Sequence, residues 1–121
     1  MKKTEYNITF KHVNGRKMYH KTITGRVFTF GGVRFGLSRK SVTHDGKPLE
    51  MHEYTLTELT TGFSVGRWAA ARTQKEVIAR LTGDTGKHYM RMIRAAIDKW
   101  TTDGNADANA GVIPAEEILT V

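Results

Sequence analysis

Apolar and polar residues alternate over short segments in the first two thirds of the chain. Apolar side chains occupy every second position of residues 6–10, which is the period of a half-buried β-strand. Asn14-Gly15 follows, and this dipeptide tolerates the positive φ angles of a tight hairpin turn. We therefore expect a second strand, from about residue 16 to 24, to run back antiparallel to the first.

Turn signals that contain glycine divide the region that follows. Gly25 permits a bend, and the pairs Gly31-Gly32, Asp45-Gly46 and Thr61-Gly62 each favour a turn. Strands joined by short connections are usually neighbours in a sheet. The pattern therefore predicts an antiparallel β-meander of five or six strands, whose later members are expected over residues 27–30, 33–37, 49–59 and 63–65.

Helical spacing replaces alternation after residue 71. Thr73 and Glu76 have the spacing of a capping box, in which the hydroxyl and the carboxylate satisfy N–H groups that the first turn leaves free. This first helix should end near Gly83.

A second helix is expected from about Gly86, with Thr85 as its candidate cap, to about Trp100. Its apolar residues fall three and four apart, which is the pattern of one buried stripe. The stripe consists of Tyr89, Met92, Ile93, Ala96, Ile97 and Trp100.

Charge is distributed unevenly along the 121 residues. The chain has 19 Lys and Arg against 12 Asp and Glu, a net charge of +7 and a pI near 9.9. All of the basic residues and eight of the acids lie in residues 1–100, and the last 21 residues carry the other four acids and a net charge of −4. We predict a single basic α+β domain over residues 1–101, followed by an acidic C-terminal tail over residues 102–121. The tail should be flexible, or form a short helix that begins at Pro114.

Composition also narrows the location of the protein. The longest apolar run is the four residues 68–71, far short of the roughly 20 that cross a bilayer. Lys2 and Lys3 are followed by an alternating segment and not by the apolar core of a signal peptide. The absence of cysteine fits a reducing compartment. We expect a cytoplasmic protein without a membrane partner.

Three cations share one face of the second predicted helix. Lys87, Arg91 and Arg94 are spaced four and three residues apart. A row of this kind can follow phosphates, because each neutralised phosphate releases condensed counterions. The alternative is the solvated outer face of an amphipathic helix. The net charge of +11 over residues 1–100 favours an anionic partner.

Further cations lie on or beside the predicted strands. If the strands are neighbours, these cations could line one side or edge of the sheet, and a basic sheet face can enter a nucleic-acid groove. Protection of exposed strand edges is the alternative. Tyr19 is a candidate base-stacking residue, because Lys17 and Lys21 share its parity. The candidate sheet cations are Arg34, Arg39, Lys40, Arg67 and Arg72.

Catalytic and metal-binding patterns are missing from the sequence. The five histidines lack the spacing that places two imidazoles on one helical face. The glycine-rich residues 30–36 lack the Lys-Ser/Thr ending of a phosphate-binding loop. We therefore expect no catalytic residues, no metal and no cofactor, and predict that the protein is not an enzyme.

Residues 59–66 and 72–78 carry a resemblance. A strand turns through Thr61-Gly62 into a short strand, and a Thr-x-Lys-Glu cap then opens a helix. This arrangement resembles small phage and prophage accessory proteins, which include anti-CRISPR inhibitors, and is similar to the end of AP2-type and integrase arm-binding DNA domains.

Two functions follow as hypotheses. The first is a non-enzymatic nucleic-acid-binding accessory protein of a phage or mobile element. The alternative is a protein inhibitor of a nucleic-acid enzyme such as a host-defence nuclease. The expected partner is a nucleic acid or a nucleoprotein enzyme, and the sequence leaves DNA or RNA, base specificity and oligomeric state open.

Overall fold

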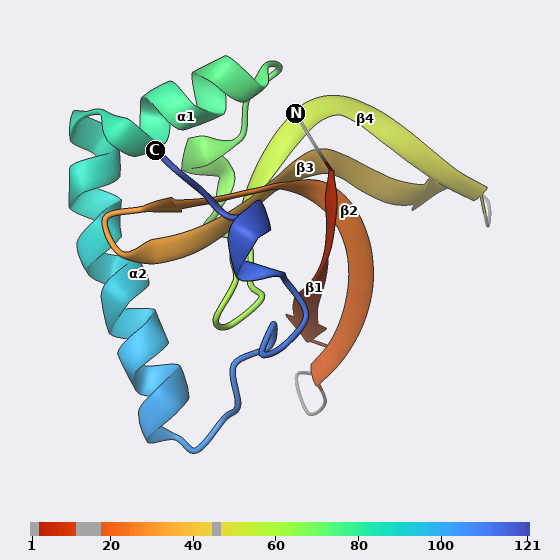
Figure 1. The fold of residues 1–121 in the computed structure, drawn as a ribbon. Coiled ribbons are helices and arrows are strands. Elements are labelled where there is room, and N and C mark those ends of the chain that lie inside the picture. The colour runs from red at the N-terminus through yellow and green to blue at the C-terminus, as the bar shows by residue number, and fades with distance from the viewer. Residues whose placement is uncertain (1–2, 12–17, 45–46) are drawn as a thin grey trace.

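The protein folds into a curled antiparallel sheet with two α-helices on one side (Figure 1). The computed structural model describes residues 3–11, 18–44 and 47–121. The predicted α+β class is confirmed. Within those residues the elements are β1 (Thr4–Lys11), β2 (Met18–Phe30), β3 (Val33–His44), β4 (Lys47–Glu58), the 3-10 helix η1 (Arg67–Ala69), α1 (Gln74–Thr82), α2 (Asp84–Thr102), the 3-10 helix η2 (Ala115–Glu117) and β5 (Leu119–Thr120).

Strand β2 is the shared element of the sheet. Its first part, Met18 to Gly25, pairs with β1, and its last part, Arg26 to Phe30, pairs with β3. Short β5 pairs in parallel with β2 at Phe28 and Thr29. β3 and β4 continue as a two-stranded ribbon beyond the body of the sheet (Figure 1).

Several predicted strand boundaries were wrong. The strand expected to end before Gly25 continues through it, so that two predicted strands are one, and β3 extends to His44. Residues 63–65 form only an isolated bridge, between Ser64 and Thr57, and not a strand. The turn at Gly31-Gly32 is confirmed, with φ values of 59° and 77°. The predicted turns at Asn14-Gly15 and Asp45-Gly46 lie outside the described residues.

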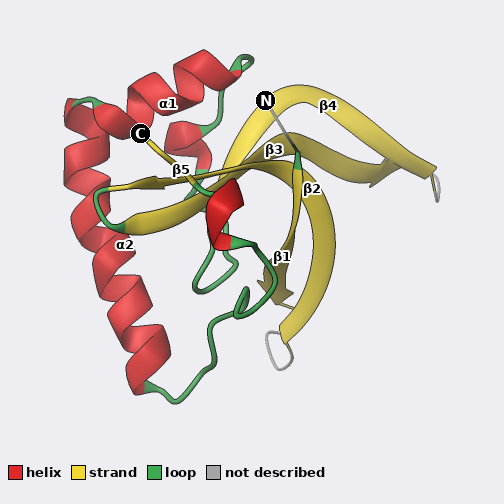
Figure 2. Ribbon diagram, in the orientation of Figure 1, coloured by secondary structure: helices red, strands yellow, loops and turns green. Residues whose placement is uncertain are grey.

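Both faces of the curled sheet bury side chains, and the helices cover one of them (Figure 2). The other face buries Tyr6, Val27 and Leu59, against which Ile113 and Ile118 pack from the end of the chain. The core under the helices includes Phe28, Phe35, Leu37 and Leu56 of the sheet with Val77, Leu81, Met90 and Ile93 of the helices.

The sequence predicted the start of α1 correctly and placed the start of α2 two residues too late. The Thr73 hydroxyl accepts a hydrogen bond from the Glu76 N–H (3.2 Å), which is the threonine half of the predicted capping box. α2 begins at Asp84, two residues earlier than expected, and Gly83 is its cap in place of Thr85. Gly86 is instead buried in the first turn, where an added Cβ would lie 1.7 Å from the Leu81 carbonyl oxygen.

The segment after α2, residues 103–121, returns along the sheet (Figure 1). We expected this tail to be flexible or to form a short helix at Pro114. Asn109 is instead buried, and its amide hydrogen-bonds the backbone of Asn7 and the carbonyl of Leu59. Pro114 precedes η2, so a short helix forms where it was expected.

Candidate nucleic-acid interface

Helix α2 presents different chemistry on its two flanks. Its inner stripe, centred on Met90 and Ile93, is buried against the sheet. At about 100° per residue, Lys87, Arg91 and Arg94 fall on one side of that stripe and Met92 falls on the other. Lys87, Arg91 and Arg94, which we call the basic row, therefore lie on one flank of the helix, as their spacing predicts.

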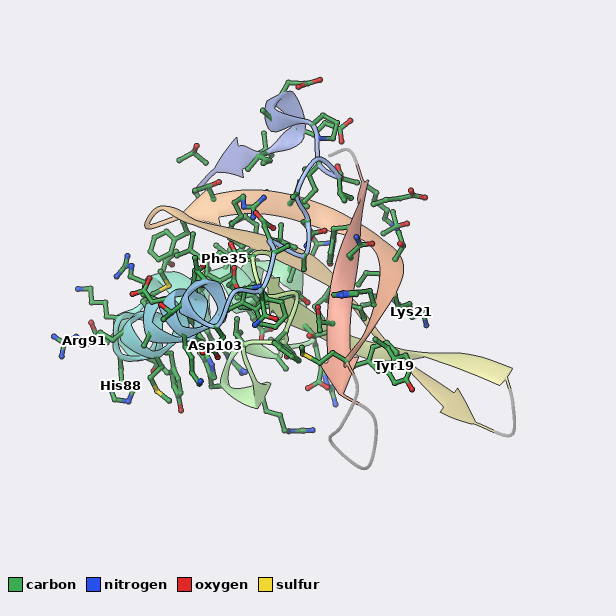
Figure 3. All side chains as sticks on the ribbon, turned by 90° about the horizontal axis from the view of Figure 1, so that it is seen from below. Tyr19, Lys21, Phe35, His88, Arg91 and Asp103 are labelled. Carbon is green, nitrogen blue, oxygen red and sulfur yellow. The ribbon has the colours of Figure 1, made fainter. Side chains whose placement is uncertain are left out.

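The basic row is exposed along its whole length. Arg94 donates a hydrogen bond to the carbonyl oxygen of Gly31 (2.9 Å), which ties the row to the turn between β2 and β3. The Lys87 Nζ lies 4.0 Å from the Asp84 Oδ1. This contact is weak, because the Lys87 side chain is largely exposed and the Asp84 side chain is fully exposed. Among the described residues Arg91 has no ion-pair partner, and Figure 3 shows its side chain pointing away from the body of the protein.

Acidic residues mark the two ends of the row. Asp84 precedes Lys87 by three residues and Asp98 follows Arg94 by four, so both lie on the same flank and both are exposed. The cations between them span about 10 Å of helix. A single strand of B-DNA advances 3.4 Å per nucleotide along the helix axis. The row is therefore long enough for a short contact with a phosphate backbone, and the acids limit its extent.

The predicted sheet cations do not form one surface. Arg34 points to the face opposite the helices, where it forms an ion pair with Asp107 and donates to the Thr60 hydroxyl (3.3 Å). Arg39 lies on the helix-facing side, with its guanidinium 5.4 Å from the centre of the Tyr54 ring. Hydrogen bonding from Arg39 lowers the pKa of Tyr54. The prediction that these cations share one side of the sheet is wrong for Arg34 and Arg39, because they are five positions apart and side chains alternate along a strand.

Two of the other three predicted cations lie beside the helices and not on the sheet. Arg67 is exposed in η1, and Arg72 is exposed directly before the cap of α1. Lys40 belongs to the stretch of β3 for which only the backbone is described.

The acidic end of the chain lies against the sheet. Asp107 pairs with Arg34, and a Glu117 carboxylate oxygen accepts a hydrogen bond from the Thr4 hydroxyl (2.9 Å). Both contacts are on the face opposite the helices. Asp107 and Glu117 thus lie on the face opposite the helices, whereas Asp103 pairs with Lys99 at the end of α2 (2.9 Å).

An apolar groove of about 630 Å³ runs along the other flank of α2. Its walls include Met92, which is 58% exposed, and the loop after β4. Phe63 and Trp100 meet edge to face there, with ring centres 5.8 Å apart. We expected Met92 to be buried in the apolar stripe, and this was wrong, because the stripe is wider than the surface that the sheet covers. The position of Met92 at the margin of the stripe was the sequence feature that could have predicted its exposure.

Exposed aromatic rings also occur on the β1–β2 hairpin. Phe10 and Tyr19 are directly opposite each other in the register, and their rings stack with centres 5.7 Å apart and planes 23° apart. They are 46% and 40% exposed. Lys21, on the same face, is also exposed, whereas Lys17 lies outside the described residues. Tyr19, the predicted stacking residue, is thus solvent-accessible. Trp100 instead packs against Phe63, and its indole N–H donates to the Ala106 carbonyl (2.8 Å).

The described residues hold no cluster of three or more potential metal ligands. None of the described helices is both long enough and apolar enough to span a bilayer. Glu58, at the edge of the groove, is buried, and its carboxylate accepts from the Thr61 N–H (3.0 Å) and hydroxyl (2.7 Å). It stabilises the turn after β4.

Comparison of the chain with protein-family models, with curated proteins and with solved structures gives no match.

Proposed function

We propose that this is a non-enzymatic nucleic-acid-binding accessory protein, and that the basic row of α2 contacts the phosphate backbone. The observation that carries the proposal is the exposure of Lys87, Arg91 and Arg94 along one flank of a regular helix. Association with a phage or mobile element is the part of the proposal that comes from the sequence resemblance.

Two structural features support phosphate contact at this flank. The row is partly ordered before binding, because its backbone is helical and Arg94 is hydrogen-bonded to the Gly31 carbonyl. This order lowers the conformational entropy that is lost on binding. Of the acids in residues 103–121, Asp107 and Glu117 contact Arg34 and Thr4 on the opposite face, and Asp103 pairs with Lys99 at the end of α2 (2.9 Å). None of these three contacts involves the row.

The test replaces Lys87, Arg91 and Arg94 with glutamine, which preserves helix propensity. Affinity for unrelated sequences should weaken to a similar extent. The slope of log affinity against log salt should become shallower by roughly 0.9 per lost contact on duplex DNA, and by roughly 0.7 on a single strand. Fluorescence anisotropy with labelled DNA and RNA at several salt concentrations measures both quantities.

A control variant separates a binding site from a general effect of charge. Replacing Lys3, Lys75 and Lys99 with glutamine removes the same charge from other exposed positions. If the row is the site, this control should keep most of the affinity and of the salt slope. Equal effects of the two variants would contradict the assignment to α2, and absence of binding by the natural protein would contradict nucleic-acid binding altogether.

The apolar groove favours a second candidate function, inhibition of a nucleic-acid enzyme by protein–protein contact. Exposed Met92 and the rings of Phe63 and Trp100 form the kind of surface that protein interfaces bury. In that case the protein should bind DNA or RNA only when an enzyme such as a host-defence nuclease is present. Met92→Glu should then abolish inhibition in a nuclease assay, while the glutamine triple variant should retain it.

A further inference from the structure

The segment that follows β4 forms an outer edge of the sheet beside the apolar groove. It pairs with β4 through two hydrogen bonds, from the Glu58 N–H to the Phe63 carbonyl (3.0 Å) and from the Val65 N–H to the Leu56 carbonyl (3.0 Å). Ser64 lies between these two bonds, and its own N–H and C=O therefore point away from β4. Ser64 is exposed, and neither of these two groups has a hydrogen-bond partner among the described residues.

The side chains of this edge segment, residues 63–65, alternate between the two faces of the sheet. Phe63 and Val65 face the helices, where Phe63 contacts the last turns of α2 and Val65 packs against the core. They form one wall of the apolar groove, and the flank of α2 that carries Met92 forms the other wall. A strand placed beside Ser64 therefore has one of its faces over the groove.

We propose that the groove binds an extended peptide segment of a partner protein, which adds to the sheet as a strand at Ser64. The backbone of the peptide pairs with the Ser64 N–H and C=O, and its side chains before and after that point enter the groove. The inference rests on protein contact at the groove, as in the second candidate function, and adds the mode of recognition. It does not depend on the basic row.

The dimensions of the site suit a short strand. The flank of α2 between Tyr89 and Trp100, both of which line the groove, is about 16 Å long. About five residues of extended chain, at about 3.3 Å each, cover that length. A helix would satisfy its own backbone groups and leave the N–H and C=O of Ser64 without partners. A strand pairs both groups, so the open edge favours a strand.

The lining of the groove selects apolar side chains. Met92 is 58% exposed and Ala96 is exposed as well, so the α2 wall offers uncovered apolar surface. The charged groups of the lining already have partners. Lys99 pairs with Asp103 (2.9 Å), and the buried Glu58 carboxylate accepts hydrogen bonds from the turn after β4. The peptide that fits is therefore uncharged, with apolar residues at alternate positions.

Selection from a displayed library of random peptides, with the full chain as bait, tests this mode of binding. The retained peptides should carry apolar residues at every second position, and not at the three- and four-residue spacing of a helix. N-methylation of a synthetic copy should weaken binding about five-fold or more at one position, because the Ser64 carbonyl then loses its donor. Methylation of the two neighbouring residues should have little effect, since their N–H groups point away from the edge.

A proline variant tests the same contact from the side of the protein. Ser64→Pro removes the outward N–H, and with it the hydroxyl that accepts from the Gly66 N–H (3.2 Å). Proline is tolerated at edge positions of this kind. The matched control Ser64→Ala loses the same hydroxyl and keeps the N–H. Fluorescence anisotropy with a labelled peptide should show an affinity about two- to twelve-fold lower for proline than for alanine, the value of one backbone hydrogen bond.

Hydrogen exchange of the natural protein gives a second measurement that needs no variant. The Ser64 amide gains an acceptor when the strand adds, so its exchange should become about tenfold slower or more at saturating peptide. Urea unfolding shows whether the proline variant is folded, and the exchange measurement decides the question if it is not. Unchanged exchange at Ser64 would overturn the inference.

The outcomes separate this inference from the second candidate function. Peptides with helical spacing, or equal affinities of the folded proline and alanine variants, overturn strand addition and leave protein contact at the groove intact. A library that yields no peptide displaced by Met92→Glu also overturns the inference, while the nuclease assay still decides inhibition. Peptide binding without inhibition of any nuclease contradicts the second candidate function alone. A dimer in sedimentation that Ser64→Pro dissociates would identify the occupant as a second copy of the chain and overturn the proposal of a separate partner.

Discussion

The amide of Asn109 connects the end of the chain to the sheet. Asn109 is 1% exposed, and its Oδ1 accepts from the Asn7 N–H at 2.6 Å. Its Nδ2 donates to the Asn7 carbonyl at 3.0 Å and to the Leu59 carbonyl at 2.8 Å. One side chain thus satisfies three backbone groups in segments that are far apart in the sequence. We predict that Asn109→Ala destabilises the fold strongly.

The size of the effect follows from these contacts. A hydrogen bond in a protein contributes about 0.5–1.5 kcal/mol net, and a buried group left without a partner costs about 1–3 kcal/mol. Three such bonds, partly replaced by water at the edge of the segment, give an expected loss of about 2–4 kcal/mol in the free energy of unfolding. Removal of residues 103–121 should cost more, because Ile113 and Ile118 would leave the core as well.

Urea unfolding followed by circular dichroism measures the loss. Asn105→Ala is a matched control, because Asn105 belongs to the same segment, is half-buried, and makes no side-chain hydrogen bond within the described residues. Its effect should remain within about 0.5 kcal/mol. The slope of free energy against urea should stay the same for both variants if the denatured state is unchanged. A stability of Asn109→Ala equal to that of Asn105→Ala would refute the view that this amide anchors the segment.

Two further predictions concern the two cores. Ile93 lies on the buried side of α2 and is 8% exposed. Ile93→Ala should therefore lower the free energy of unfolding by about 2–5 kcal/mol, which thermal unfolding measures. An unchanged transition would mean that the stripe is not packed. Burial raises the pKa of the Tyr6 phenol to about 12. The folded state therefore favours the neutral phenol, and its contribution of about 3 kcal/mol is complete below pH 10 and lost as the pH rises toward 12. Tyr6→Phe should lose less stability than the natural protein between pH 9.5 and 11.5 in urea titrations, and parallel curves would contradict the assignment.

Local signals in the sequence predicted local structure well. Thr73 and Glu76 lie within one turn, and the Gly31-Gly32 dipeptide determines its own backbone angles, so neither depends on distant residues. The basic row was predictable for the same reason, because helical spacing alone places its members on one flank.

Features that depend on distant partners were not predictable. Arg34 and Asp107 are 73 residues apart in the sequence, and no periodicity connects them. Asn109 is surrounded by small polar residues that are typical of a linker, and its burial follows from backbone groups of β1. The exposure of Met92 depends on how closely the loop after β4 approaches α2. The spacing of apolar residues in α2 holds no information about that distance.

The partners of β2 are synthesised at very different times. β1 and β3 flank it in the chain, whereas the pairing of Phe28 with Leu119 spans 91 residues. While the ribosome is still making α1 and α2, the edge of β2 that β5 later covers is unpaired, and Val27 lacks the apolar cover of Ile113 and Ile118. An open strand edge beside an apolar surface is prone to pair with other chains. Sheet completion is thus a late folding event, and the nascent protein is most vulnerable to aggregation just before it.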